Sequence, residues 1–396
     1  MSVKGTPALL RTLNQGALMQ RLRDDGPLSR AQLARDTGLS KPTVSQALAE
    51  LEAVGLVRPV GPAAPSRGRT AMLYEPDPTA GYVVGLDIGR AWIRVAVADL
   101  AGAIIARSDT PNRARTAGAV VRAAAREARA AVKQAGIGWK RVVHTVVGSP
   151  GVFDPATGRL WHAPNLPDWS KPGLADELRD ALTPSTTIDN DANLAAVGER
   201  DFGRGRDARS FVYLELGTGL GVGIVIDGEL YRGAHGAAGE VGYIPWPGME
   251  DGARSERGRL EEATSAAAVV AAARRAGMRG ELTAKDVFDA ARGGDAKAVQ
   301  AVGIEAERIA LLLATLSAVV DPEFIVLGGG IGGSADLLRP PLEARLRELT
   351  PLETRIEETE LGTDAIVLGA IATALGTARE LVFAERLATR AAAIGG

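Results

Sequence analysis

The sequence predicts an α/β protein in which a small winged helix-turn-helix domain precedes a larger domain of alternating strands and helices. Two short helices joined by a turn at Gly38 lie near the N-terminus. Further on, strand-like runs at 82–86, 93–98 and 142–147 alternate with a helical pattern at 117–134. Glycine-rich turns follow several of these runs, as is typical of mixed sheets with exposed loops.

Length and composition set limits on the protein. The 396 residues, 46% of them hydrophobic, are enough for two or three packed domains. Net charge is +3 over residues 1–80 and -5 over the remainder, so DNA remains a possible partner of the first part. The absence of cysteine excludes disulfides and thiolate sites. The apolar-rich run 309–320 is too short to cross a bilayer, so we expect a cytoplasmic chain without membrane insertion.

Residues 1–80 form a unit bounded by the Pro- and Gly-rich stretches 61–68 and 76–81. Leucines at helical spacing predict a first helix that ends at 24–27. Ser29 and Gln32 form a Ser-x-x-Gln capping box that begins a second helix. The residues expected to face inward from that helix are Ala31, Leu33 and Ala34. Ser40 caps a third helix, with Pro42 in its first turn.

The third helix carries the expected DNA contacts. Val44, Leu48, Leu51 and Val54 form its buried stripe, while polar residues near its start point outward, at the end that enters the major groove in such motifs. The candidate contacts on this helix are Ser40, Lys41, Thr43, Ser45 and Gln46. Strand-like runs at 56–60 and 70–74 flank a loop whose Arg67 and Arg69 suit DNA phosphates. The alternative, a helical domain with a merely solvated polar face, does not account for the basic wing.

Residues 29–34 and 37–45 resemble the DNA-binding segment of repressors in the ROK (repressor, open reading frame, kinase) family. The resemblance runs from about Ala8 to Gly376 and includes segments 87–89, 148–151, 163–169, 188–193, 216–223 and 327–332. It implies a two-lobed, actin-like (ribonuclease-H-like) sugar-kinase fold. The first lobe is expected at 81–190 and the second at 191–396, with a C-terminal helix that can return to the first lobe.

The resemblance also implies a sugar site. Asn190, Asp191, Glu240 and Glu261 match the family's sugar contacts, and Asp191 matches its general base. Carboxylates and amides suit this role because each sugar hydroxyl both donates and accepts, and burying one unpaired costs about 1 to 3 kcal/mol. Taken singly, Asn190 and Asp191 could serve as a helix cap, and Glu261 could be a solvated helix acid. Four matches in the family's order favour the sugar site.

The first phosphate loop departs from the family's kinases. Those kinases read Asp-x-Gly-Gly-Thr-Lys, whereas this chain reads Asp87-Ile88-Gly89-Arg90-Ala91-Trp92. Arg90 replaces the second glycine and Ala91 lacks the hydroxyl, so we expect phosphoryl transfer to be lost. Arg90 could still meet phosphate as a charge. Glycines 217, 219 and 328–330 are retained, but the fold itself needs such turns.

The family's zinc site is also missing. Its one His and three Cys ligands are replaced, with Tyr243 standing at the histidine position, while Glu261 keeps its register. His144, His162 and His235 are scattered without ligand spacing. We therefore expect no metal and no cofactor. Tyr243 retains a hydroxyl and joins the expected sugar residues, with a reach that differs from that of imidazole.

These observations lead to three hypotheses. The favoured one is a sugar-responsive repressor of carbohydrate metabolism genes that binds operator DNA as a homodimer or higher homo-oligomer. The apolar helix 305–319 could form the dimer surface or could belong to the core. The second is an ATP-dependent sugar kinase that keeps a DNA-binding domain. The third is a scaffold that senses a partner protein. A single winged helix reads few bases, which is the reason for expecting a dimer.

Overall fold

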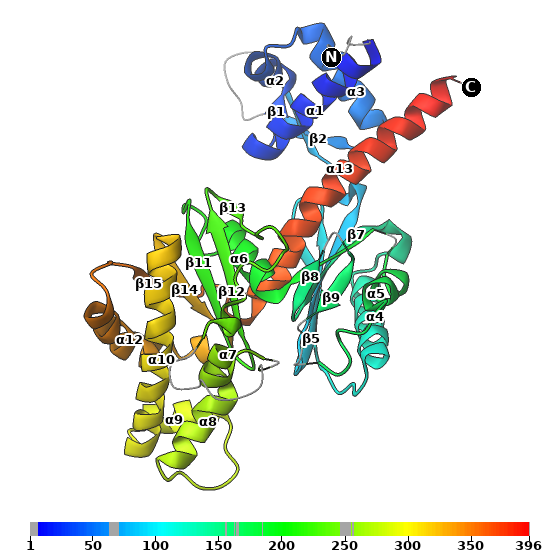
Figure 1. Ribbon diagram of the computed structural model, residues 1–396. Helices are drawn as coiled ribbons and strands as arrows, with labels where there is room; N and C mark the ends of the chain where they lie inside the picture. Colours follow the sequence, from blue (N-terminus) through cyan, green and yellow to red (C-terminus); the bar gives the residue numbers. More distant parts are fainter. Residues whose placement is uncertain are drawn as a thin grey trace.

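Two sheet-containing lobes lie below a small N-terminal domain, and one long helix runs from between the lobes past that domain (Figure 1). The structure is a computed structural model that describes residues 7–62, 71–154, 157–161, 163, 166–183, 185–245, 255 and 257–395. This arrangement agrees with the expected α/β architecture headed by a winged helix-turn-helix.

The N-terminal domain contains three helices and a small sheet. Its elements are α1 (Pro7–Asp25), β1 (Leu28–Ser29), α2 (Arg30–Thr37), α3 (Lys41–Ala53), β2 (Val57–Pro62) and β3 (Met72–Pro76), with sheet order β1-β3-β2. The capping box of Ser29 and Gln32 is present, and Ser40 caps α3. Gly38 has a φ of 69°, a left-handed conformation that favours glycine at this turn. Arg67 and Arg69 lie outside the described residues.

The core of this domain corrects the expected burial at two positions. Leu33, Val44, Leu48 and Leu51 are fully buried. Ala31, however, is exposed, because it lies two residues before Leu33 and therefore on the opposite side of α2. Val54 is only half-buried, since it follows the last residue of α3.

The first lobe is built on a five-stranded sheet of order β10-β7-β4-β5-β6. Its elements are η1 (Pro78–Ala80), β4 (Tyr82–Ile88), β5 (Trp92–Asp99), β6 (Ile104–Pro111), α4 (Ala117–Gln134), η2 (Trp139–Arg141), β7 (Val142–Ser149), β8 (Val152–Asp154), β9 (Arg159–Trp161), α5 (Leu174–Ala181) and β10 (Thr186–Asn190). Strands β4, β5 and β6 are antiparallel, while β7 runs parallel to both β4 and β10. The expected strand at 82–86 and helix at 117–134 are confirmed.

The second lobe contains the sheet β13-β12-β11-β14-β15 and most of the remaining helices. Its elements are α6 (Asp191–Phe202), β11 (Phe211–Leu216), β12 (Leu220–Ile226), β13 (Glu229–Leu230), η3 (Val241–Tyr243), α7 (Arg259–Thr264), α8 (Ala266–Arg275), α9 (Ala284–Arg292), α10 (Ala296–Val320), β14 (Phe324–Gly328), α11 (Gly329–Gly332), α12 (Ala335–Leu349), β15 (Arg355–Glu358) and η4 (Gly362–Asp364). Ile309, Leu313 and Leu316 of α10 are buried in this lobe's core.

The last helix, α13 (Ala365–Gly395), packs against the sheet of the first lobe. Val367, Ile371 and Ala374 are buried there beside Val83 and Val146. By length and composition the segment Gly362–Arg390, which contains an 18-residue window with a mean hydropathy of 1.6, could cross a membrane. It contains a longer apolar stretch than 309–320, and its burial against the sheet is typical of a core helix.

Helix α13 crosses α6 at very short range. A Cβ added to Gly198 of α6 would lie 2.3 Å from the carbonyl oxygen of Ala365, and one added to Gly369 would lie 1.7 Å from that of Leu194. Leu194 packs in the core that includes the first sheet, whereas Ala195 packs with the second. The crossing therefore lies between the two lobes.

We expect Gly369→Ala to destabilise the protein, because the added methyl group would meet the α6 backbone and force the helices apart. The loss should be at least about 1 to 3 kcal/mol, measured by urea unfolding. Gly376→Ala is the matched control on the same helix, since its Cβ meets nothing within 4 Å. Alanine there should be neutral or stabilising by up to about 1 kcal/mol. Equal stabilities of the two variants would contradict the close crossing.

Candidate functional site

A cleft of about 390 Å³ lies where the two lobes meet. Its walls come from the β4–β5 hairpin, the start of α6, the end of β11 with its following turn, α7 and the glycine-rich start of α11. The volume lies within the range of ~300–1,000 Å³ that is usual for small-molecule sites. Because both lobes contribute, a ligand here would contact each of them.

The cleft brings together Asn190, Asp191, Glu240 and Glu261, four of the five residues expected to hold sugar. Tyr243, half-buried in η3, is not among the described residues that line it. Asn190 ends β10 of the first lobe, whereas the other three belong to the second lobe: Asp191 begins α6, Glu240 directly precedes η3 and Glu261 lies in α7.

Some of these side chains have structural roles as well. The Asn190 side chain accepts from the backbone N–H of Asn193 at 3.1 Å and donates to the carbonyl of Gly151 at 3.1 Å. It therefore caps α6, as the alternative interpretation held. Glu261 accepts from the backbone N–H of Leu220 at 3.3 Å, which ties α7 to β12. These bonds position the side chains at the cleft wall.

A glycine sets the position of Glu240. Gly239 has a φ of 90°, and a Cβ there would lie 1.9 Å from the carbonyl oxygen of Val222 in β12. Only glycine allows this backbone to approach the strand so closely in a left-handed conformation. The contact holds the preceding loop against the sheet, so Glu240 projects into the cleft from a supported backbone.

Burial controls the charge of the cleft. It raises the pKa of Asp191 well above its usual range, and the charges of Glu215, Asp87 and Glu240 raise it further. Burial, followed by the charge of Glu261, raises the pKa of Glu240 to about 7. Protonated carboxyls donate as well as accept hydrogen bonds, and this matches the needs of a hydroxyl-rich ligand.

Sequence reasoning missed two cleft residues, Tyr213 and Glu215. The Tyr213 hydroxyl donates to Glu215 at 2.8 Å, and burial raises the pKa of Glu215 to about 7. Both residues lie in β11, where they alternate with the apolar residues of a strand that reads as a buried one. The glycine-rich turn that follows was the only local signal.

The altered phosphate loop forms a tight and well-supported hairpin. The N–H of Gly89 bonds the carbonyl of Trp92 at 2.9 Å, and Asn112 bonds both Ala91 and Gly89 at 2.8 Å. Arg90 and Trp92 both line the cleft and are exposed. These side chains stand where the family's kinases have Gly and Lys.

Asp87, the first residue of this loop, is paired within the protein. Its carboxylate accepts from Arg94 at 2.8 Å, and Arg94 lies 3.8 Å from Asp109. Burial raises the pKa of Asp87 to about 6 although Arg94 opposes the shift. The pair reduces the positive charge that Arg94 could offer to a phosphate.

The second glycine turn is required by the fold. Gly329 has a φ of 77°, and a Cβ there would lie 2.4 Å from the carbonyl oxygen of Leu216. This close approach between α11 and β11 accounts for the glycine without reference to nucleotide.

Within the part of the chain that the structure describes, no group of three or more His, Asp or Glu side chains could hold a metal ion. Of the segments that match the family's zinc motif, residues 252–254 and 256 lie outside that part.

The DNA-binding candidates lie at the start of α3. Lys41 and Gln46 are exposed, while Thr43 and Ser45 are half-buried. Ser40 is exposed too, and its hydroxyl accepts from the N–H of Thr43 at 3.3 Å, so it acts as the helix cap. The helix therefore presents a short polar surface at the end suited to the major groove.

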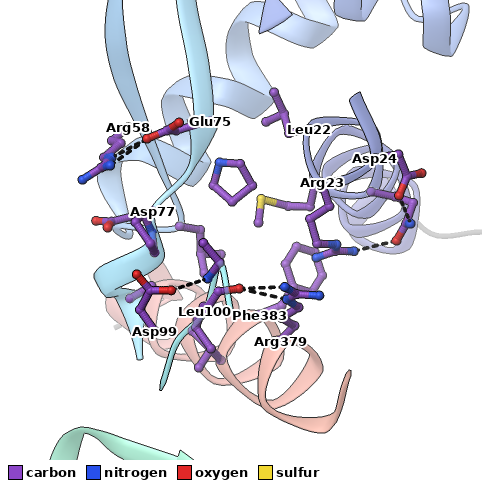
Figure 2. Close-up of a pocket in the computed structure, with 18 of the residues that line it drawn as sticks. Leu22, Arg23, Asp24, Arg58, Glu75, Asp77, Asp99, Leu100, Arg379 and Phe383 are labelled. Atoms are coloured by element: carbon purple, nitrogen blue, oxygen red, sulfur yellow. Dashed lines mark hydrogen bonds and ion pairs between the residues drawn. The ribbon is translucent and has the colours of Figure 1, made fainter. Parts of the chain in front are cut away.

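A junction links this domain to the lobes, around a cavity of about 720 Å³ between α1, the end of β3, the β5–β6 turn and α13 (Figure 2). Arg379 of α13 donates twice to the carbonyl of Leu100, at 3.0 and 2.9 Å. Val382 is buried in the core of the winged helix domain. Further along, Arg390 donates to the carbonyl of Glu50 at the end of α3 at 2.9 Å. Helix α13 thus contacts both the lobes and the DNA-binding domain.

We expect the cleft carboxyls to make stability depend on pH. The pKa of Glu215 is about 7 in the folded protein against 4.5 for an ordinary glutamate, so the folded state retains the proton to higher pH. The free energy of unfolding should therefore fall between about pH 4.5 and 7. Glu215→Gln should reduce this fall by up to about 3 kcal/mol, measured by urea unfolding at pH 5 and 8. Glu229→Gln, at an exposed position of β13, is the control. Parallel pH profiles for Glu215→Gln and the unmodified protein would disprove the assignment.

Comparisons with known proteins agree with this arrangement. The ROK family profile matches residues 83–377, and a MarR family profile matches residues 12–68. A xylose repressor from Caldicellulosiruptor bescii is 27% identical over 93% of this chain and 96% of its own. A glucokinase from Halalkalibacterium halodurans is 32% identical over 73% of this chain and 93% of its own.

Among solved structures, a ROK family transcriptional regulator homologous to the Escherichia coli MLC protein has a TM-score of 0.77 at 22% identity, covering 95% of this chain and 98% of that one. That likeness concerns the fold, including the two lobes and the N-terminal domain. The expected family is confirmed: the chain belongs to the ROK family and carries an N-terminal winged helix domain of the MarR type.

Proposed function

We propose that this protein is a cytoplasmic, sugar-responsive transcriptional repressor of carbohydrate metabolism genes. The observation that carries the proposal is the path from cleft to DNA-binding helix: α6 begins at Asp191, crosses α13 at Gly198, and α13 reaches α3. A winged helix with an exposed polar helix start supports the DNA part. The relationship to a xylose repressor over nearly the whole chain supports the sugar part.

Sugar would bind to the carboxyls and amide that meet in the cleft. Asn190, Asp191, Glu240 and Glu261 come from both sides of the lobe interface, so their hydrogen bonds to one ligand favour a closed arrangement of the lobes. The energy needed is small. If sugar prefers one lobe arrangement by about 1.4 kcal/mol, operator occupancy changes tenfold. One good charged hydrogen bond provides more free energy than that.

Sugar kinase activity is the second candidate, and the 32% identity to a glucokinase favours it. Asp191 stands at the position of the family's base. Two observations disfavour kinase activity. Arg90 and Ala91 replace the glycine and the threonine of the family's phosphate loop. Glu215 also places a carboxylate near that loop, where it interacts electrostatically with Asp87. A carboxylate repels phosphate, so we propose that the chain has lost phosphoryl transfer and needs no cofactor.

We further propose that the protein binds DNA as a homodimer, because two half-sites give the affinity that one winged helix lacks. The helix segment 305–319, which the sequence offered as a dimer surface, is largely committed to the core of its own lobe. Ile309, Leu313 and Leu316 face the core of their own lobe, and Val319 is the most exposed apolar residue near its end.

Two substitutions on α3 test the DNA interface. Lys41→Ala should weaken binding to every DNA sequence and reduce the slope of log affinity against log salt by about 1, because one phosphate contact is lost. Gln46→Ala should cost about 1 to 3 kcal/mol on the operator alone, because it removes a base contact. Glu52→Ala, exposed near the other end of α3, is the control. Fluorescence anisotropy at several salt concentrations measures all three, and unchanged affinity for the first two would remove α3 from the interface.

Asp191→Ala tests the sensor. Operator binding without sugar should stay near normal, because Asp191 lies at the cleft, outside the DNA-binding domain, and its carboxylate accepts a hydrogen bond from the N–H of Ala192 in its own helix. The response of operator binding to sugar should disappear, measured by anisotropy over a panel of pentoses and hexoses. A variant that responds at the same sugar concentration as the unmodified protein would place the sensor elsewhere.

The same preparations separate repressor from kinase. The unmodified protein should release no ADP from ATP in the presence of the activating sugar. Sugar-dependent release that is lost in Asp191→Ala would instead establish the kinase.

A further inference from the structure

We propose that the half of the cleft lined by the β4–β5 hairpin and the end of β11 is a second sugar subsite, so that the effector is a disaccharide or other glycoside. The proposal rests on the repressor function above and specifies its ligand. It concerns Asp87, Trp92 and Glu215, which line the cleft and to which the comparison with the family gave no sugar role.

The cleft residues form two groups that meet at Asp191. On one side, Glu240 interacts electrostatically with Glu261. On the other, Glu215 interacts with Asp87, Arg94 and Tyr213. Asp191 interacts with members of both groups, namely Glu215, Asp87 and Glu240. Both groups line the same cleft, so a sugar unit held by the first group would leave the residues of the second facing the rest of the cleft.

Trp92 gives this second space an aromatic wall. Its side chain is 41% exposed although it lines a cleft, and its neighbour Ile93 is buried in the lobe core. The hydrogen bonds of Gly89 and Asn112 fix the hairpin that carries it. A flat, rigid indole suits the apolar C–H face of a pyranose ring, while the hydroxyls at the ring edge remain available to polar groups.

Glu215 and Asp87 provide those polar groups. Burial raises their pKa values to about 7 and 6, so near neutral pH the pair shares a mixture of protonated and charged carboxyls. Such groups can accept from one hydroxyl and donate to another. An aromatic wall with adjacent carboxyls therefore fits a neutral polyol.

The same residues disfavour a phosphate. The Glu215 carboxylate repels a polyanion, and the Arg94 guanidinium is paired with Asp87 at 2.8 Å. Arg90 also lines this half of the cleft and supplies positive charge. Nucleotide is therefore the competing occupant that the experiment has to address. A metal ion is not a competing occupant, because no group of three or more described His, Asp or Glu side chains could hold one.

Isothermal titration calorimetry of the full-length protein tests the proposal. The probes are glucose, xylose and mannose, the disaccharides cellobiose, maltose, xylobiose and mannobiose, and ADP. We expect at least one disaccharide to bind ten-fold or more tightly than its own monosaccharide, and ADP not to compete with it.

Trp92→Ala should then lower the affinity for that disaccharide about ten-fold and leave the affinity for the monosaccharide within two-fold. Trp92→Phe should restore most of the lost affinity. Tyr231→Ala, an exposed aromatic position outside the cleft lining, should change neither affinity. Thermal unfolding confirms that each variant is folded. If Trp92→Ala proves unfolded, Glu215→Thr replaces it. This variant removes the carboxyl group, so it should selectively lower the affinity for the disaccharide, whereas Trp92→Phe should stay close to the unmodified protein.

The outcomes distinguish this inference from the proposed function. Monosaccharides that bind as tightly as every disaccharide, with Trp92→Ala unchanged, would overturn the second subsite and leave the sugar sensor intact. Displacement of disaccharide by ADP would also overturn the second subsite, because it would show that this half of the cleft binds nucleotide. Binding of no sugar at all would overturn the sensor itself.

Discussion

The close crossing of α6 and α13 is the constraint on which the rest of the structure depends. Gly198 and Gly369 let two helix backbones approach so nearly that a methyl group on either would meet the other chain. Helices in such contact cannot slide independently, because the packing offers few alternative arrangements. Since α6 starts at the cleft and α13 ends beside the winged helix, a change at one end of this pair is mechanically connected to the other.

In the proposed function, a kinase-like framework serves binding in place of catalysis. The walls of the cleft keep the glycine turns, and Asp191 stands at the position of the family's general base. The half of the cleft that includes the altered phosphate loop, however, contains Glu215, the Asp87–Arg94 pair and the exposed indole of Trp92. Catalysis requires interactions that strengthen in the transition state, whereas a sensor needs interactions that differ between two lobe arrangements. Buried carboxyls with raised pKa values suit the second requirement, because they exchange hydrogen bonds with hydroxyls without needing a counter-ion.

Local signals predicted most of the fold. The capping box at Ser29, the cap at Ser40 and the amphipathic pattern of 117–134 each depend on residues within one or two turns, so the sequence reveals them directly. Glu215 was not predictable in this way, because its importance arises only when β11 is placed beside Asp87. Tyr243 likewise matches a family position by register, but its place in η3 depends on how the neighbouring loop packs. The return of α13 to the first lobe was raised as a possibility only, since a buried apolar helix does not indicate which sheet it covers.

The part played by Val382 in the core of the N-terminal domain has a consequence for biosynthesis. The residues that it contacts in that domain are made about 300 residues earlier. At about 5 to 20 residues per second, the ribosome needs roughly 15 to 60 s to reach it. Until then the nascent N-terminal domain lacks one buried member of its apolar core. The apolar core of the N-terminal domain is therefore completed only after the segment of α13 that carries Val382 has been made.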